Sequence, residues 1–105
     1  MRKDANKIVL NDEKLEVSSE ILRALAHPLR MRILAFIDKH GQINVNKIYN
    51  TLQIEQSITS QHLRVLRLAG LVDTEREGKF VLYAIDYDKL GSAVDAIKSF
   101  LENED

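Results

Sequence analysis

Residues 54–72, IEQSITSQHLRVLRLAGLV, divide into an apolar side and a polar side at helical spacing. With successive residues set 100° apart, the aliphatic side chains gather on one side together with Thr59 and His62. The other side has no acid, and Leu68 intrudes on it only near the end. Its polar residues, which we call the polar face, are Gln56, Ser57, Ser60, Gln61, Arg64 and Arg67. Glutamine, serine and arginine read base edges and hold phosphates. The pattern therefore predicts a helix suited to the major groove of DNA.

Three further helices are predicted before this one. The first is expected over residues 13–26, and the second begins at Pro28, a residue suited to a first helical turn, and ends at Gly41. A short third helix is expected over residues 45–52, followed by a tight turn over residues 53–55. The second and third helices are expected to bury Leu29, Ile33, Leu34, Phe36, Ile37, Ile48 and Leu52.

A β-hairpin and a last helix are predicted after the polar face. Two strands flank a turn at residues 77–79, and Val81, Tyr83 and Ile85 alternate with their neighbours in the second strand. The last helix carries an apolar seam spaced in threes and fours, formed by Tyr87, Leu90, Val94, Ile97 and Leu101. A small core has little room for the whole seam. It is therefore expected to form a homodimer interface together with Leu15 and Leu22 of the first helix.

The order α-α-α-α-β-β-α is that of a winged helix-turn-helix domain, mainly α with a small β-hairpin and an N-terminal dimerisation helix. Residues 1–12 are expected to form a flexible segment and residues 13–105 a single domain. Within it, the helix-turn-helix is expected at about residues 44–69, the wing at about 71–86 and the C-terminal dimer helix at about 87–101.

Composition limits the possible functions. The chain has 105 residues and no cysteine, which excludes disulfides and thiolate metal ligands. It has no apolar run of membrane-spanning length and no signal peptide, so a cytoplasmic location without membrane contact is expected. The net charge of −1 argues against strong non-specific DNA binding. The acids near the polar face fall at its start and on the following strand, so steep salt dependence and weak binding to random DNA are expected.

Three segments resemble the arsenic-repressor (ArsR/SmtB) family of bacterial regulators. LAHPLRMRIL at 25–34 resembles the family's LADPTRLRIL, SITSQHLRVLRLAGLV at 57–72 is similar to STVSHHLKVLREAGLV, and REGKFVLY at 76–83 is similar to the wing. The resemblance implies a homodimeric repressor that leaves a pseudo-palindromic operator when a signal arrives. Arg76 and Lys79 would then serve the wing, and the positions that enter the major groove would be Gln56, Ser57, Ser60, Gln61 and Arg64.

The departures from the family pattern concern the signal. The family's CVC metal motif is replaced by Asn44-Val45-Asn46, and residues 87–105 contain no histidine. Amides bind soft metals poorly, so neither a metal site nor a cofactor is expected. The signal is left open as a small organic ligand, a partner protein or none. Gln53 stands where relatives often have glycine, and a left-handed backbone there would cost about 1 kcal/mol.

The sequence leaves alternative functions open. A winged-helix domain can bind protein instead of DNA, and a hard-metal sensor could use Asp86, Asp88 and His40 across a dimer, although their spacing does not favour it. An enzyme is disfavoured because the sequence has no phosphate-binding glycine loop and no nucleophile with an Asp–His relay. Among single residues, His62 is expected to be a hydrogen-bonded core histidine and His27 a helix-capping residue. For Arg30, contact with the DNA backbone and salt bridges to nearby acids are equally plausible.

Overall fold

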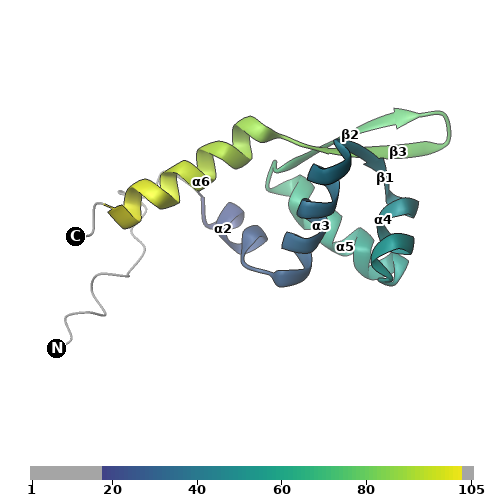
Figure 1. The fold of residues 1–105 in the computed structure, drawn as a ribbon, viewed down its shortest axis with the longest axis horizontal. Helices are drawn as coiled ribbons and strands as arrows, with labels where there is room; N and C mark the ends of the chain where they lie inside the picture. Colours follow the sequence, from purple (N-terminus) through teal and green to yellow (C-terminus); the bar gives the residue numbers. More distant parts are fainter. Residues whose placement is uncertain (1–17, 103–105) are drawn as a thin grey trace.

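The computed structural model describes residues 18–102, in which helices pack on one side of a small antiparallel sheet (Figure 1). In chain order the elements are α2 (Ser19–Leu25), α3 (Pro28–His40), β1 (Gln42–Asn44), α4 (Val45–Leu52), α5 (Gln56–Leu68), β2 (Val72–Glu77), β3 (Phe80–Ile85) and α6 (Tyr87–Glu102). The order confirms the winged helix-turn-helix expected from the sequence. The one additional element is the strand β1.

Capping side chains set the starts of the first helices. The Ser18 hydroxyl accepts the N–H of Ile21 at 3.2 Å, and Asn44 Oδ1 accepts the N–H of Lys47 at 2.9 Å. Gly41 ends α3 with φ 78°, a backbone conformation that L side chains rarely adopt. The expectation of one helix over residues 13–26 was wrong in its bounds, because the serine cap starts α2 at Ser19. Residues 1–17, including Leu15 and the expected flexible segment, lie outside the described residues.

The core forms where α3, α4 and α5 meet the inner face of the sheet. Its largest fully buried side chains are Ile33, Ile37, Ile48, Thr59, Leu63, Leu66, Leu71 and Val72. Burial of each large aliphatic side chain is worth roughly 1.5–3 kcal/mol, so this cluster holds the helices in place. The inward positions predicted for α3 and α4 are confirmed, with Leu29, Phe36 and Leu52 partly buried against the cluster.

The sheet has three strands in the order β1-β3-β2, whereas the sequence predicted a two-stranded hairpin. Both pairings are antiparallel, and Ile43 of β1 lies opposite Tyr83 of β3. Because β1 lies between α3 and α4, its pairing fixes the wing to the start of the helix-turn-helix. A strand of three residues, Gln-Ile-Asn, is too short to show a period of two, which is why the pattern did not reveal it.

Helix α6 leaves the end of β3 and runs away from the wing, past α2 (Figure 1). Ala93 is buried, and Leu90 and Ile97 pack partly against the core, whereas Val94 and Leu101 are 44% and 53% exposed. The Tyr87 hydroxyl donates to the Asp38 carboxylate, and this bond raises the pKa of Tyr87. The apolar seam is thus divided between the chain's own core and solvent. Among the described helices, none is long and apolar enough to cross a membrane.

A candidate nucleic-acid interface

Helix α5 presents the polar face to solvent. All six residues of that face are exposed, and the opposite side of the helix buries Thr59, Leu63 and Leu66 completely. The Thr59 hydroxyl donates to the carbonyl of Glu55 at 3.0 Å, which satisfies the one polar side chain that is buried within residues 18–102. The division predicted from the spacing is therefore the division between solvent and core in the structure.

The turn between α4 and α5 places the polar face relative to α4. Gln53 has φ 56° and ψ 50°, the left-handed conformation that glycine adopts most easily. Its N–H and that of Ile54 both donate to the carbonyl of Tyr49, closing the end of α4. The strain anticipated at Gln53 is therefore present, at about 1 kcal/mol.

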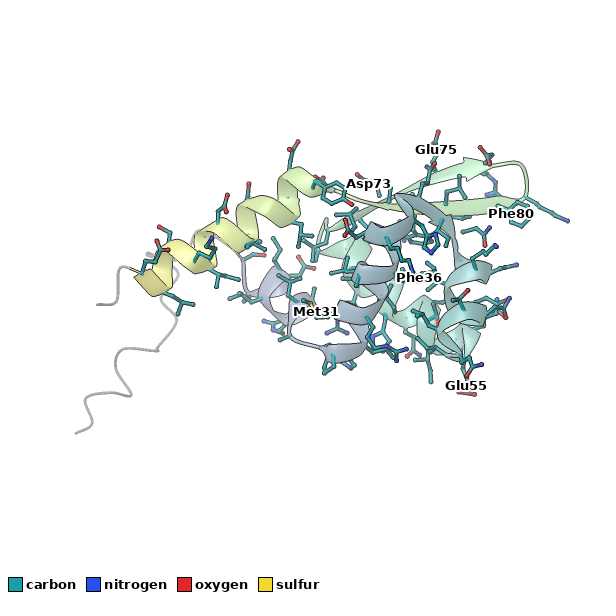
Figure 2. All side chains as sticks on the ribbon, in the orientation of Figure 1. Met31, Phe36, Glu55, Asp73, Glu75 and Phe80 are labelled. Atoms are coloured by element: carbon teal, nitrogen blue, oxygen red, sulfur yellow. The ribbon has the colours of Figure 1, made fainter. Side chains whose placement is uncertain are left out.

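The wing separates its charges between two faces. Opposed residues of an antiparallel pair point to the same side of the sheet, and Val72, Thr74 and Arg76 lie opposite Ile85, Tyr83 and Val81. Val72 and Ile85 are buried under the helices, so this is the α5 side of the hairpin. The acids Asp73, Glu75 and Glu77 alternate onto the outer face, and Figure 2 shows Glu75 pointing away from the helices. The acids of β2 therefore do not oppose the polar face.

Tyr83 is a residue of this surface that the sequence did not indicate, because the strand pattern showed only that it alternates with its neighbours. Its side chain and four residues of the polar face line a hollow of about 320 Å³, the α5–β3 notch, formed by Ser60, Gln61, Arg64, Arg67 and Tyr83. Val81, Tyr83 and Ile85 lie on the same face of β3. Their spacing does not show that β3 continues past the buried core at Tyr83. The notch brings a phenol beside two guanidinium groups, a combination suited to an anionic oxygen.

The two basic residues of the wing lie in different places. Arg76 is on the strand face turned toward α5. Lys79 is at the hairpin tip, 5.8 Å from the ring centroid of Phe80, and lines a hollow with Asn44 and Asn46 at the start of α4. Figure 2 marks this tip with Phe80, at the end of the hairpin away from α6. Arg76 thus extends the polar face, and Lys79 stands apart from it.

Arg30 links α5 to the corner between α2 and α3. Its guanidinium donates to the carbonyls of Ala24 at 2.8 Å and Arg23 at 2.9 Å, and lies 3.2 Å from Nδ1 of His62. Among the residues that the structure describes, backbone carbonyls and a histidine rather than acids are the partners of Arg30, so the expected salt bridges are not formed there. Contact of Arg30 with the DNA backbone stays a prediction. His27 caps α3 as predicted, since its Nδ1 accepts the N–H of Leu29 at 3.1 Å.

His62 lies on the inner side of α5, partly buried and hydrogen-bonded as expected. Its ring centroid lies 4.6 Å from that of His27. Burial lowers the pKa of His62, and the nearby His27 and Arg30 lower that pKa further. The ring therefore stays neutral at physiological pH.

Candidate metal ligands do not converge within the described part of the chain. Residues 18–102 contain no group of three His, Asp or Glu side chains able to hold one ion. Asp86 accepts the N–H of Lys89 at 3.0 Å at the start of α6, and the His40 ring lies 4.5 Å from that of Phe36. The trio Asp86, Asp88 and His40 is therefore not assembled within one chain.

Comparisons with known proteins place the chain in a family. The model of the "Bacterial regulatory protein, arsR family" matches residues 27–74. The HTH-type transcriptional repressor SmtB of Mycobacterium tuberculosis is 37% identical over 86 residues, which are 81% of this chain and 63% of that repressor. The transcriptional repressor PagR of Bacillus anthracis is 36% identical over 76 residues, which are 72% of this chain and 76% of that repressor.

Solved structures agree with the sequence matches. The crystal structure of PagR superposes with a TM-score of 0.67 at 31% identity, covering 83% of this chain and 99% of that one. The crystal structure of a possible transcriptional regulator for arsenical resistance gives 0.70 at 32% identity, covering 83% and 93%. The chain spans less than two thirds of the length of SmtB but most of these two structures. It belongs to the ArsR family of bacterial regulatory proteins, with the winged helix-turn-helix fold.

Proposed function

We propose that the chain is a sequence-specific regulator that binds double-stranded DNA, and that it acts in the cytoplasm as a homodimeric repressor at a pseudo-palindromic operator. One observation carries the proposal: among the helices of residues 18–102, α5 has the only long face that is exposed, polar and free of acids, and it lies between the helix-turn-helix turn and the wing. The names of the relatives, which include transcriptional repressors, support the same conclusion.

The polar face would enter the major groove. Gln61 is suited to bidentate pairing with adenine, and Arg64 to guanine or a phosphate. The remaining members of the polar face would contact flanking bases and phosphates. Arg76 would follow the backbone on the α5 side of the wing, and Lys79 would reach the flanking backbone from the tip.

Tyr83 is added to this surface on the geometry of the α5–β3 notch. A phenolic hydroxyl donates to phosphate oxygen without carrying charge, and the adjoining Arg64 and Arg67 supply the positive potential. We assign the notch to one backbone phosphate, which would fix the depth of α5 in the groove.

Dimerisation would use the exposed part of the α6 seam together with α2. An open apolar hollow of about 580 Å³, which we call the apolar groove, lies between α2, α3 and α6 and is lined by Leu25, Met31, Leu34, Ala35, Asp38, Ile85, Leu90, Val94, Ile97 and Lys98. A second copy covering this surface would remove Val94, Leu101 and Met31 from water. A two-fold dimer would set its α5 helices about 34 Å apart, in successive major grooves.

A protein-binding winged helix is the rival function. Its support is the near-neutral net charge of −1, and the acid-free polar face counts against it. The inducing signal stays unassigned: a small effector, a partner protein or none.

Selection of bound sequences from random duplex DNA tests the proposal, followed by fluorescence anisotropy on the enriched duplex over a salt series. We expect an inverted repeat with half-sites about 10 base pairs apart, bound by a dimer with steeply salt-dependent affinity. The same selection with an Arg64→Ala/Gln61→Ala variant is the matched control and should lose the enrichment. Absence of enrichment for the wild-type chain at low salt would refute DNA reading and favour the protein-binding rival.

A further inference from the structure

Three helices meet at the guanidinium of Arg30. The group holds two carbonyl oxygens at the end of α2, projects from the first turns of α3, and contacts His62 in the middle of α5. The cap of α3, His27, stacks at a tilt of 55° against the same histidine. We call Arg30, His27 and His62 the histidine–arginine tie. Within residues 18–102, the Arg30–His62 contact is the side-chain hydrogen bond that connects α5 to the corner between α2 and α3.

The donors in the tie determine which nitrogen of each ring accepts a hydrogen bond. An imidazole nitrogen that accepts a hydrogen bond carries no proton. Nδ1 of His27 accepts from a backbone amide, and Nδ1 of His62 faces a guanidinium that can only donate. Neither donor can reverse its role, so in this arrangement Nδ1 is the accepting nitrogen of each ring.

Acid is therefore incompatible with the tie as it stands. A proton on Nδ1 of His62 would turn two N–H groups toward each other and add a second positive charge beside Arg30. Arg30 and His27 are the charged or titratable groups that face His62 from α3 and from the turn before it. On α4 the charged residue is Lys47, which lies beside His40 near the other end of α3, and the acids of β2 are on the outer face of the wing. No carboxylate in these elements is placed to offset the added charge.

The sign of the pH effect follows from the lowered pKa of His62. Because the folded state resists protonation, the unfolded or loosened state binds the proton first as the pH falls below the ordinary histidine value of 6.5. The neutral ring's contribution to stability is complete above this value and declines below it. Burial and the neighbouring Arg30 and His27 thus act in the same direction.

We propose that Arg30 is a positioning residue that holds α5 through neutral His62, and that mild acid breaks this connection and weakens DNA binding. The proposal rests on the proposed function, because α5 carries the polar face. Arg30 also holds the end of α2, whose Leu25 lines the apolar groove. The contacts of Arg30 with the carbonyls of Ala24 and Arg23 and with His62 therefore join α5 to that groove. A shift of α2 on binding at the groove would reach α5 through Arg30.

The test compares three asparagine variants of the full chain. His62→Asn keeps an acceptor at the Nδ1 position without a titratable proton, and His27→Asn keeps a good helix cap. His40→Asn is the matched control, because His40 contacts Phe36 at the far end of α3. Affinity is measured by anisotropy from about pH 7.5 to about pH 5.5, on a duplex enriched by selection and on a mixed-sequence duplex at low salt. Nitrogen NMR of the imidazoles reports each ring's tautomer independently of DNA.

We expect the wild-type protein and His40→Asn to lose about 10-fold in affinity over this range, and His62→Asn to lose little. His27→Asn should show an intermediate loss, and NMR should place the proton of His27 and His62 on Nε2 at neutral pH. A flat wild-type profile, an equal loss in His62→Asn, or a proton on Nδ1 of His62 would each overturn the proposal. If neither duplex binds at any pH, the proposed function fails, and the tautomers still decide whether the tie exists. Circular dichroism confirms that each variant is folded.

Discussion

Helices α5 and α6 each bury one side and expose the other, and their exposed sides differ in kind. The exposed side of α5 is the polar face, in which guanidinium, amide and hydroxyl groups stand without acids. The exposed side of α6 includes Val94 and Leu101, next to the apolar groove. Polar groups of this kind can form specific hydrogen bonds with bases and phosphates. Aliphatic groups are stabilised only when a partner removes them from water. The difference indicates a nucleic-acid partner for α5 and a protein partner for α6.

The largest effect is expected from placing charge on the exposed apolar side of α6. Val94→Glu combined with Leu101→Glu places charge on the exposed seam, so we expect monomers by sedimentation and a loss of about 100-fold in affinity for an inverted repeat. Ser99→Glu, also exposed on α6, is the matched charge control and should stay dimeric. Ile97 is a poorer probe, because it packs partly on the chain's own core. A dimeric double variant would remove α6 from the proposed interface.

Single substitutions by alanine on α5 test the polar face. Arg64→Ala or Gln61→Ala should weaken specific binding by roughly 1–3 kcal/mol and relax the preference at one base position. Lys39→Ala removes an exposed charge at the end of α3 and should leave both quantities unchanged. Competition anisotropy with single-base variants of the selected duplex measures the two effects. Unchanged affinity and preference in both truncations would mean that the polar face is not the DNA-contacting surface.

A smaller effect is expected at Tyr83, and it tests whether the DNA-contacting surface extends from α5 to β3. Tyr83→Phe removes one hydroxyl from the α5–β3 notch without changing its volume, and one net hydrogen bond is worth about 0.5–1.5 kcal/mol. We therefore expect a loss of about 2- to 10-fold in affinity, equal on the selected and mixed-sequence duplexes, because a phosphate contact carries no base information. The salt slope should not change, since a neutral hydroxyl releases no counterion. A loss confined to the selected duplex would instead indicate a base contact by Tyr83.

The sequence predicted those features whose causes are local. The start of α3 at Pro28, its end at Gly41 and the two sides of α5 follow from residues within a few positions of each other. Strand β1 was missed because it is extended through pairing with β3, about forty residues further along the chain. The same limit explains Arg30, whose partners are backbone carbonyls six and seven residues earlier and a histidine 32 residues later.

Tyr83 shows a related limit within the site. Alternation placed Tyr83 on the same face of its strand as Val81 and Ile85, but it could not show where α5 stops covering that face. The residue types of the polar face were readable because they are contiguous on one helix. The notch that joins them to the wing depends on the tertiary placement of β3 against α5.

The smallest effect concerns the turn that presents the polar face. Gln53→Gly relieves a left-handed backbone at φ 56° but gives the unfolded chain more freedom, so we expect a net gain of about 0.5 kcal/mol in the free energy of unfolding. Urea denaturation measures it, and Gln61→Gly in the exposed interior of α5 is the opposite control, with a loss of about 1 kcal/mol. A destabilised Gln53→Gly would show that the glutamine side chain contributes more than its backbone strain removes. DNA affinity should stay within about 2-fold of wild type, because the turn keeps its two hydrogen bonds to Tyr49 and the polar face keeps its orientation.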